Sequence, residues 1–164
     1  MPTTKTTEEY RAQLAAGRQA ELLARAADPA TPPADLACLL DAARYQYPEV
    51  VRAIASNPSV DSAEAWGWLA MLAPREVVHN PSFLAAIKDD AEIIGSLWSE
   101  NTDALLTPDT PPEVAAVLVA QAGAFSFLHL EETEFTREQF EAMLPAALPA
   151  WRGALDANPA APRP

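Results

Sequence analysis

The chain has 164 residues, and 49% of them are hydrophobic, which is enough to build the core of one domain. Its formal net charge is −12, and this argues against nucleic-acid binding, which depends on Lys and Arg neutralising phosphates. The single cysteine, Cys38, excludes an intramolecular disulfide, a four-cysteine zinc site and a thiolate-held iron–sulfur cluster.

The ends of the chain are poor in core-forming residues. We expect a disordered N-terminus over residues 1–5, a single helical-repeat domain over residues 6–156 and a flexible Pro-rich tail over residues 157–164. No apolar signal-peptide segment opens the sequence. The most apolar stretch, residues 114–130, contains several polar residues and is too short for a bilayer. It predicts a buried helix, and with it a cytoplasmic protein without membrane contact.

Helix-forming residues dominate between these ends, and the sequence predicts an all-α fold. Thr6 and Glu9 have the spacing of a capping box at the start of a first helix. Gly17 is expected to break that helix before a second one over residues 18–27. Thr136 and Gln139 repeat the capping-box spacing late in the chain.

A proline-containing motif recurs along the chain. Most copies contain the dipeptide Asp-Pro or Asn-Pro, and two copies contain the tripeptide Thr-Pro-Pro. The copies lie at residues 27–36, 56–60, 79–84 and 107–114, with a start of another at 157–159. Their irregular spacing falls within the range of 20–50 residues that is typical of stacked helical repeats.

The residues of this motif predict a helix, a tight turn and a second helix. The residue before a proline is disfavoured in the α region, so Asp or Asn at that position ends a helix. Thr31 and Thr110 are expected to cap the following helix, with proline at its first position. One such unit cannot bury its apolar face alone, so the units must stack. The expected architecture is an irregular α-solenoid-like stack of short helices joined by Asn/Asp-Pro turns.

Residues 28–39 and 51–58 resemble the leucine-rich repeat variant family, with an Asp-Pro or Asn-Pro turn, a Thr-Pro-Pro helix start and a Val-Arg-containing helix. The match is strongest over residues 18–60. The resemblance implies an α-solenoid similar in style to HEAT and armadillo arrays, and a binding role. It implies no catalytic residue, and one cysteine cannot supply the iron–sulfur ligands that some relatives carry.

Acidic residues are concentrated in the second half of the chain, and 48 consecutive residues between Lys88 and Arg137 contain no Lys or Arg. If the carboxylates there share a face, their field would steer a basic partner. A solvated surface that only maintains solubility is the alternative. The acidic candidates for partner binding are Asp89, Asp90, Glu92, Glu131, Glu132 and Glu134.

Two aromatic pairs add candidates, Tyr45 with Tyr47 and Trp66 with Trp68. Residues two apart do not share a helix face, so one member of each pair is expected at the surface. Exposed Tyr and Trp side chains often dominate binding energy. Packing between repeats is the alternative for all four.

Nothing in the sequence has the spacing of a catalytic, nucleotide or metal site, so we expect no enzyme activity, no cofactor and no metal. The function we expect is that of a non-enzymatic adaptor or scaffold that binds another protein. If the acidic residues provide the contact, the partner is expected to be basic. The first alternative is an acidic inhibitor, immunity-type protein or nucleic-acid mimic that blocks a basic site. A HEAT-like DNA-repair enzyme is a more remote alternative.

Overall fold

The computed structural model describes residues 4–90, 93, 97, 104–121, 134–147, 149–159 and 161. The chain divides into two compact units, Met1–Phe83 and Leu84–Pro164, and each is described by itself. Within the described residues all regular structure is helical and there is no strand, as the sequence predicts. The division falls inside the single domain expected over residues 6–156, which stays a prediction.

The first unit contains six complete helices and the start of a seventh. They are α1 (Thr7–Ala15), α2 (Gln19–Ala27), α3 (Pro33–Ala43), α4 (Pro48–Ala55), α5 (Ala63–Leu72), α6 (Pro74–Val78) and α7 (Pro81–Asp89), which crosses the division. The described helices that follow are α10 (Pro112–Gln121), α11 (Arg137–Ala146) and α12 (Pro149–Ala157). Helix α10 covers the start of the apolar stretch 114–130, and residues 122–130 lie outside the described residues.

The local signals in the sequence set most helix boundaries. Both capping boxes are formed, at Thr6 with Glu9 and at Thr136 with Gln139. Gly17 separates α1 from α2 with a φ of +76°, a left-handed conformation that glycine adopts without steric cost. Six helices begin with proline at their first position, where the missing N–H is not needed.

Thr31 and Thr110 have a different role from the expected one. Neither caps the following helix; the hydroxyl of Thr31 donates to the carbonyl of Arg25 at 2.6 Å, and that of Thr110 donates to the carbonyl of Leu105 at 2.6 Å. The N-cap position of α3 is Pro32, which follows Thr31 and offers no side-chain hydrogen bond. The threonines therefore satisfy carbonyls that precede the turn, because the chain folds back on itself there.

The expected loose ends are also ordered at their inner edges. The backbone N–H of Lys5 donates to the Asp35 carboxylate at 2.9 Å. At the other end α12 extends to Ala157, and the side chain of Asn158 is buried. Tertiary contacts hold these residues, and such contacts are not visible in local composition.

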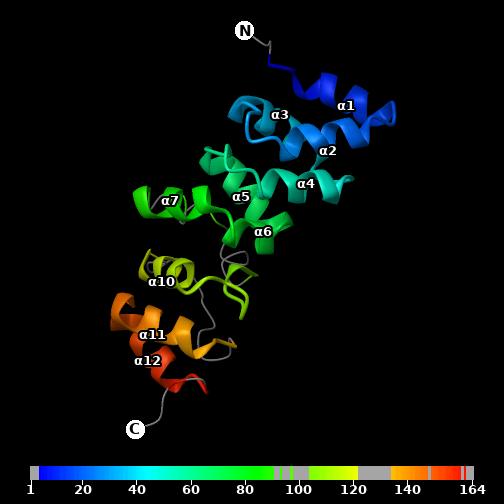
Figure 1. Ribbon diagram of the computed structural model, residues 1–164. Coiled ribbons are helices and arrows are strands. Elements are labelled where there is room, and N and C mark those ends of the chain that lie inside the picture. The colour runs from blue at the N-terminus through cyan, green and yellow to red at the C-terminus, as the bar shows by residue number, and fades with distance from the viewer. Residues whose placement is uncertain are drawn as a thin grey trace. The chain divides into compact units, whose positions relative to one another are not determined.

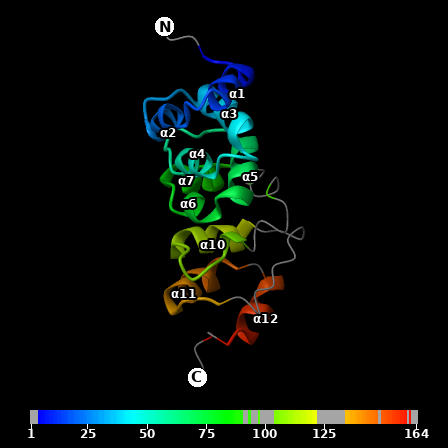
Figure 2. The same ribbon diagram turned by 90° about the vertical axis from the view of Figure 1, so that its right-hand side faces the viewer.

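In the first unit, three helices pack on the helix two places further along the chain. Helix α1 lies along α3, α2 lies along α4, and α4 contacts α6 (Figure 1). Apolar side chains fill the space between them, including Leu22, Leu39 and Ile54, all 2% exposed or less. In the second unit α10 packs against α11 (Figure 2). Leu118 of α10 and Phe140 of α11 are buried.

The turn after α4 is joined to the end of α2 by a buried asparagine. The Nδ2 group of Asn57 donates to the carbonyls of Ala26 at 2.7 Å and Asp28 at 2.9 Å. Its Oδ1 accepts the N–H of Ser59 at 2.8 Å, and the hydroxyl of Ser59 donates to the carbonyl of Pro29 at 2.6 Å. One side chain thus closes its own turn and also donates hydrogen bonds to carbonyls at the end of α2, two helices earlier in the chain.

The turn after α6 repeats this arrangement one layer further along. The Nδ2 group of Asn80 donates to the carbonyls of Ala55 at 2.7 Å and Asn57 at 2.9 Å. Its Oδ1 accepts the N–H of Ser82 at 2.9 Å, and the hydroxyl of Ser82 donates to the carbonyl of Pro58 at 2.6 Å. We call these two sets of hydrogen bonds the asparagine rungs. They give the ends of α2, α4 and α6 a common register.

The position equivalent to the rungs in the turn after α2 is Asp28. Its Oδ1 accepts the N–H of Ala30 at 2.9 Å and so closes the same kind of turn. The side chain is exposed, and a carboxylate has no donor to reach a further helix. Asp28 therefore fits the first turn of the series, which receives a rung from Asn57 and makes none.

The second unit uses a glutamine for a similar purpose. The Nε2 group of Gln139 donates to the carbonyls of Thr107 at 2.7 Å and Thr110 at 2.6 Å. Its Oε1 accepts the N–H of Thr136 at 2.8 Å as part of the capping box. Gln139, at the third position of α11, thus joins the start of this helix to the turn before α10.

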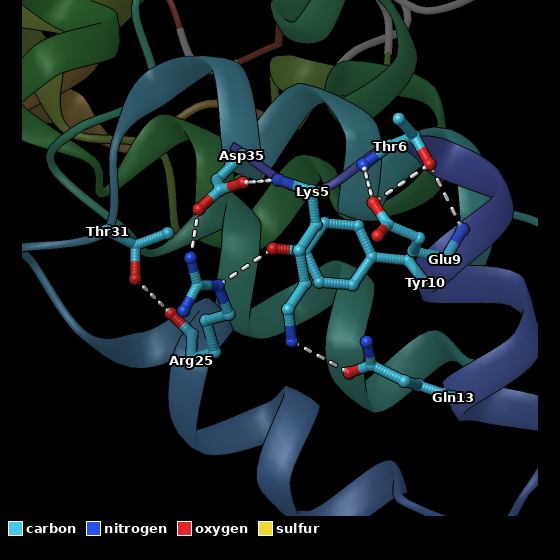
Figure 3. Close-up of polar contacts among 8 residues, drawn as sticks. All are labelled: Lys5, Thr6, Glu9, Tyr10, Gln13, Arg25, Thr31 and Asp35. Atoms are coloured by element: carbon cyan, nitrogen blue, oxygen red, sulfur yellow. Dashed lines mark hydrogen bonds and ion pairs between the residues drawn. The ribbon is translucent and has the colours of Figure 1, made fainter. Parts of the chain in front are cut away.

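A polar cluster ties the first three helices together (Figure 3). The Asp35 carboxylate, 1% exposed, pairs with the guanidinium of Arg25 and accepts the N–H of Lys5. The Nε group of Arg25 donates to the hydroxyl of Tyr10 at 2.8 Å. Burial, and secondly the nearby charge of Asp35, raise the pKa of Tyr10 above its ordinary value.

Removing the donor of a buried rung should be costly, whereas a change at Asp28, which makes no rung, should not. Asn80→Ala leaves the carbonyl of Ala55 and the N–H of Ser82 without their partner, while the carbonyl of Asn57 keeps the N–H of Val60. At about 1–3 kcal/mol per group we expect a loss of about 2–6 kcal/mol in the free energy of unfolding. Asp28→Asn, at the exposed equivalent position, should change it by less than about 0.5 kcal/mol. Urea unfolding measures both, and equal losses would contradict a stabilising role for the rungs.

The polar cluster predicts a loss of stability in alkali. The unfolded chain releases the Tyr10 proton near pH 10.0, whereas the folded protein holds it to higher pH. The contribution of Tyr10 is therefore complete below pH 10 and falls as the pH rises further, by at most about 1.4 kcal/mol per pH unit. In Tyr10→Phe this part of the slope should disappear, because no proton is bound. If the free energy of unfolding changed with pH in the same way in both proteins, the proposed contribution of Tyr10 would be wrong.

Candidate functional site

The four candidate aromatic residues have very different environments. Tyr45 is 74% exposed, whereas Tyr47 and Trp68 are half-buried. Trp66 is 0% exposed and packs on Phe83 with 5.3 Å between ring centroids. Trp66 is therefore a core residue, and its expected role in partner binding is not compatible with its burial. The expectation of one exposed member per pair fits Tyr45 with Tyr47, whereas in the other pair Trp66 is buried and Trp68 is only half-buried, because α5 is packed on both sides.

Tyr45 and Trp68 come together although they are 23 positions apart. Their rings meet edge to face at a centroid distance of 6.4 Å. The guanidinium carbon of Arg44 lies 4.2 Å from the ring centroid of Trp68 and 5.0 Å from that of Tyr45. We call these three residues the aromatic–arginine cluster. Cation–π and edge-to-face contacts hold an exposed tyrosine in one orientation, which lowers the entropy lost when it binds.

Asp41 connects this cluster to α1. Its carboxylate pairs with Arg44 at 3.0 Å and with Arg11 at 3.0 Å. Arg11 pairs in turn with Glu8. Sequence reasoning missed Asp41 and Arg44, although an Asp–Arg pair three apart at the end of a helix is a recognisable local signal.

Two furrows flank the aromatic–arginine cluster. The first has a volume of about 300 Å³ and lies between α1 and α3; Leu14, Tyr45 and Tyr47 are among the residues that line it. The second has a volume of about 120 Å³ and lies between α3 and α5, where Glu64 and Trp68 contribute to its wall. Asp41 lines both furrows. Helices α1, α3 and α5 thus border two adjacent furrows.

The second furrow has one carboxylate without a counter-charge. Arg44 and Arg11 both pair with Asp41, whereas the exposed side chain of Glu64 makes no hydrogen bond or ion pair with the residues that the structure describes. Glu64 lies one helical turn before Trp68 on α5. Since the guanidinium of Arg44 already lies over the ring of Trp68, the Glu64 carboxylate is the group of this furrow that is open to a further cation.

The acidic candidates are only partly described. Asp89 and Asp90 are exposed at the end of α7, and Glu134 is exposed before α11. Glu92, Glu131 and Glu132 lie outside the described residues. That these six residues form one acidic face stays a prediction.

Other classes of site have little support in the described part of the chain. No group of three or more His, Cys, Asp or Glu side chains is placed there to hold a metal ion. No described helix is both long and apolar enough to cross a bilayer. In the Arg25–Asp35–Tyr10 cluster, Asp35 and Tyr10 are buried, Arg25 is half-buried and the polar groups are paired to one another, so the cluster serves the fold (Figure 3).

Comparison of the chain with models of protein families, with curated proteins and with solved structures gave no match. The resemblance to the leucine-rich repeat variant family therefore stays a prediction from the quoted motifs.

The contrast between the aromatic residues can be measured. Trp66→Ala should lower the free energy of unfolding by about 3–5 kcal/mol, because it empties a fully buried site. Tyr45→Ser should lower it by about 1 kcal/mol or less, because only an exposed ring contact is lost. Urea unfolding followed by circular dichroism gives both values. A loss for Tyr45→Ser as large as that for Trp66→Ala would place Tyr45 in the core.

Proposed function

We propose that this protein is a non-enzymatic protein-binding module of the adaptor or scaffold type. The observation that carries the proposal is the orientation of Tyr45, 74% exposed and braced by Arg44 and Trp68. A large aromatic side chain is costly to leave in water, and here it stands between two hollows that a partner can fill.

The architecture we propose for this module is an irregular α-solenoid. In the first unit the contacts of α1 with α3, α2 with α4 and α4 with α6 are those of consecutive layers. The asparagine rungs support the same arrangement, because each one joins equivalent turns of neighbouring layers. The resemblance to the leucine-rich repeat variant family points in this direction as well.

A second candidate function follows from charge. Asp89, Glu113 and Glu134 are exposed, and no Lys or Arg occurs over the 48 residues that follow Lys88. An acidic inhibitor, immunity-type protein or nucleic-acid mimic would use such residues to cover a basic site. A cytoplasmic location and the absence of nucleic-acid binding belong to both proposals and rest on composition.

Capture of partners from the lysate of the native host distinguishes the two functions. With the aromatic–arginine cluster as the contact, Tyr45→Ser should reduce capture about tenfold or more, as loss of a binding hot spot does. Met71→Ser is the matched control, because Met71 is also a large exposed hydrophobic residue of the first unit, at 45%. It should leave capture unchanged.

Salt dependence and an acidic variant complete the design. A partner that survives moderate salt and is lost only in Tyr45→Ser fits the adaptor function. A basic partner that salt releases, and that Glu131→Gln, Glu132→Gln and Glu134→Gln together abolish, fits the acidic inhibitor. An empty capture with the unsubstituted protein would contradict both.

A further inference from the structure

The two furrows beside the aromatic–arginine cluster are successive features of one face. The first lies between α1 and α3 and the second between α3 and α5, so α3 separates them, and Asp41 borders both. A ligand that fills both furrows must therefore cross α3. A folded domain presents few segments narrow enough for this, whereas an extended peptide does so readily.

The spacing of packed helices sets the register of such a peptide. Axes of packed helices lie about 8–10 Å apart, so the furrows on either side of α3 are separated by about that distance. A polyproline II segment advances about 3.1 Å per residue and has three residues per turn. Side chains at positions i and i+3 are then about 9 Å apart and point to the same side. They match the two furrows.

The chemistry of the furrows differs. The α1–α3 furrow offers Leu14, Tyr45 and Tyr47, which suit an apolar side chain or a proline ring. The α3–α5 furrow is lined by two carboxylates, Asp41 and Glu64, and by the guanidinium of Arg44, which lies over the ring of Trp68. Because Arg44 is paired with Asp41, the unpaired carboxylate of Glu64 leaves this furrow with a net negative charge, which suits a cation. The other charges of this face, on Arg11, Asp41 and Arg44, are engaged with one another.

We infer that the aromatic–arginine cluster and its furrows bind an extended segment of a partner protein with Lys or Arg three positions from an apolar residue. The cation lies in the α3–α5 furrow against the carboxylate of Glu64, one helical turn from Trp68, and the apolar side chain lies in the α1–α3 furrow against Tyr45. This inference rests on the proposed protein-binding function and adds the chemistry of the partner.

A synthetic peptide tests this chemistry directly. Leu-Pro-Pro-Arg-Pro-Pro-Leu places an apolar residue three positions from the arginine on both sides, so either chain direction fits. Titrated into the full chain, it should shift the indole N–H resonance of Trp68, which is assigned as the signal lost in Trp68→Phe. Leu-Pro-Pro-Glu-Pro-Pro-Leu should bind at least about tenfold more weakly, since its charge is repelled by Glu64.

A matched pair of variants tests the role of Glu64. Glu64→Gln should weaken binding of the arginine peptide about threefold to fivefold at low salt, the range of an exposed ion pair. Glu113→Gln makes the same charge change at the equivalent helical position, the second residue of α10, and should have no effect. Circular dichroism confirms that both variants are folded.

Each other outcome overturns the inference. These are no shift of the Trp68 signal at millimolar peptide, equal binding of the glutamate peptide, or equal weakening by Glu64→Gln and Glu113→Gln. If the peptide fails while Tyr45→Ser still removes a captured partner, the protein-binding function stands and the extended basic ligand is wrong. If both fail, the function fails as well.

Discussion

The first unit depends on one kind of interaction: a buried asparagine after one helix donates hydrogen bonds to the end of the helix two places earlier in the chain. Its first five helices have only eight to eleven residues, a length at which isolated helices are marginal in water. They must be stabilised by neighbours, and apolar packing alone permits sliding. The Nδ2 groups of Asn57 and Asn80 remove that freedom, because each donates to two specific carbonyls of the preceding layer and so fixes the offset between the layers.

The register that the rungs impose also positions the candidate site. Arg44 and Tyr45 follow α3, whereas Trp68 belongs to α5, and they meet only when these helices have a fixed offset. A shift of one helical turn, about 5.4 Å, would separate the guanidinium from the indole ring. Stability and the geometry of the candidate site are therefore linked in this unit, since the hydrogen bonds between the turns that precede α3 and α5 also set the offset of these helices.

Much of the fold was predictable because its signals are local. A capping box needs two residues three apart, a proline at a first position needs no partner, and Gly17 needs only its own backbone. The errors occurred where a side chain bonds across the turn or across the stack. Thr31 and Thr110 were expected to cap the next helix, but their hydroxyls reach carbonyls before the turn. Asn57 and Asn80 were recognised as helix ends, and their bonds to the preceding layer were not.

By itself the sequence determined the helical fold of the described residues, the position of most of their helix boundaries and a set of four aromatic residues that includes Tyr45 and Trp68. Those properties depend on contacts within one turn or on composition. Tertiary structure decided that Trp66 is buried against Phe83 and that Tyr45 is exposed beside Trp68. It also brought Arg44, Asp41 and Glu64 beside them, three residues that were not among the candidates from the sequence. The physical reason is that the exposure and the charge partners of a side chain depend on which helix packs against it, and residues far apart in sequence decide this.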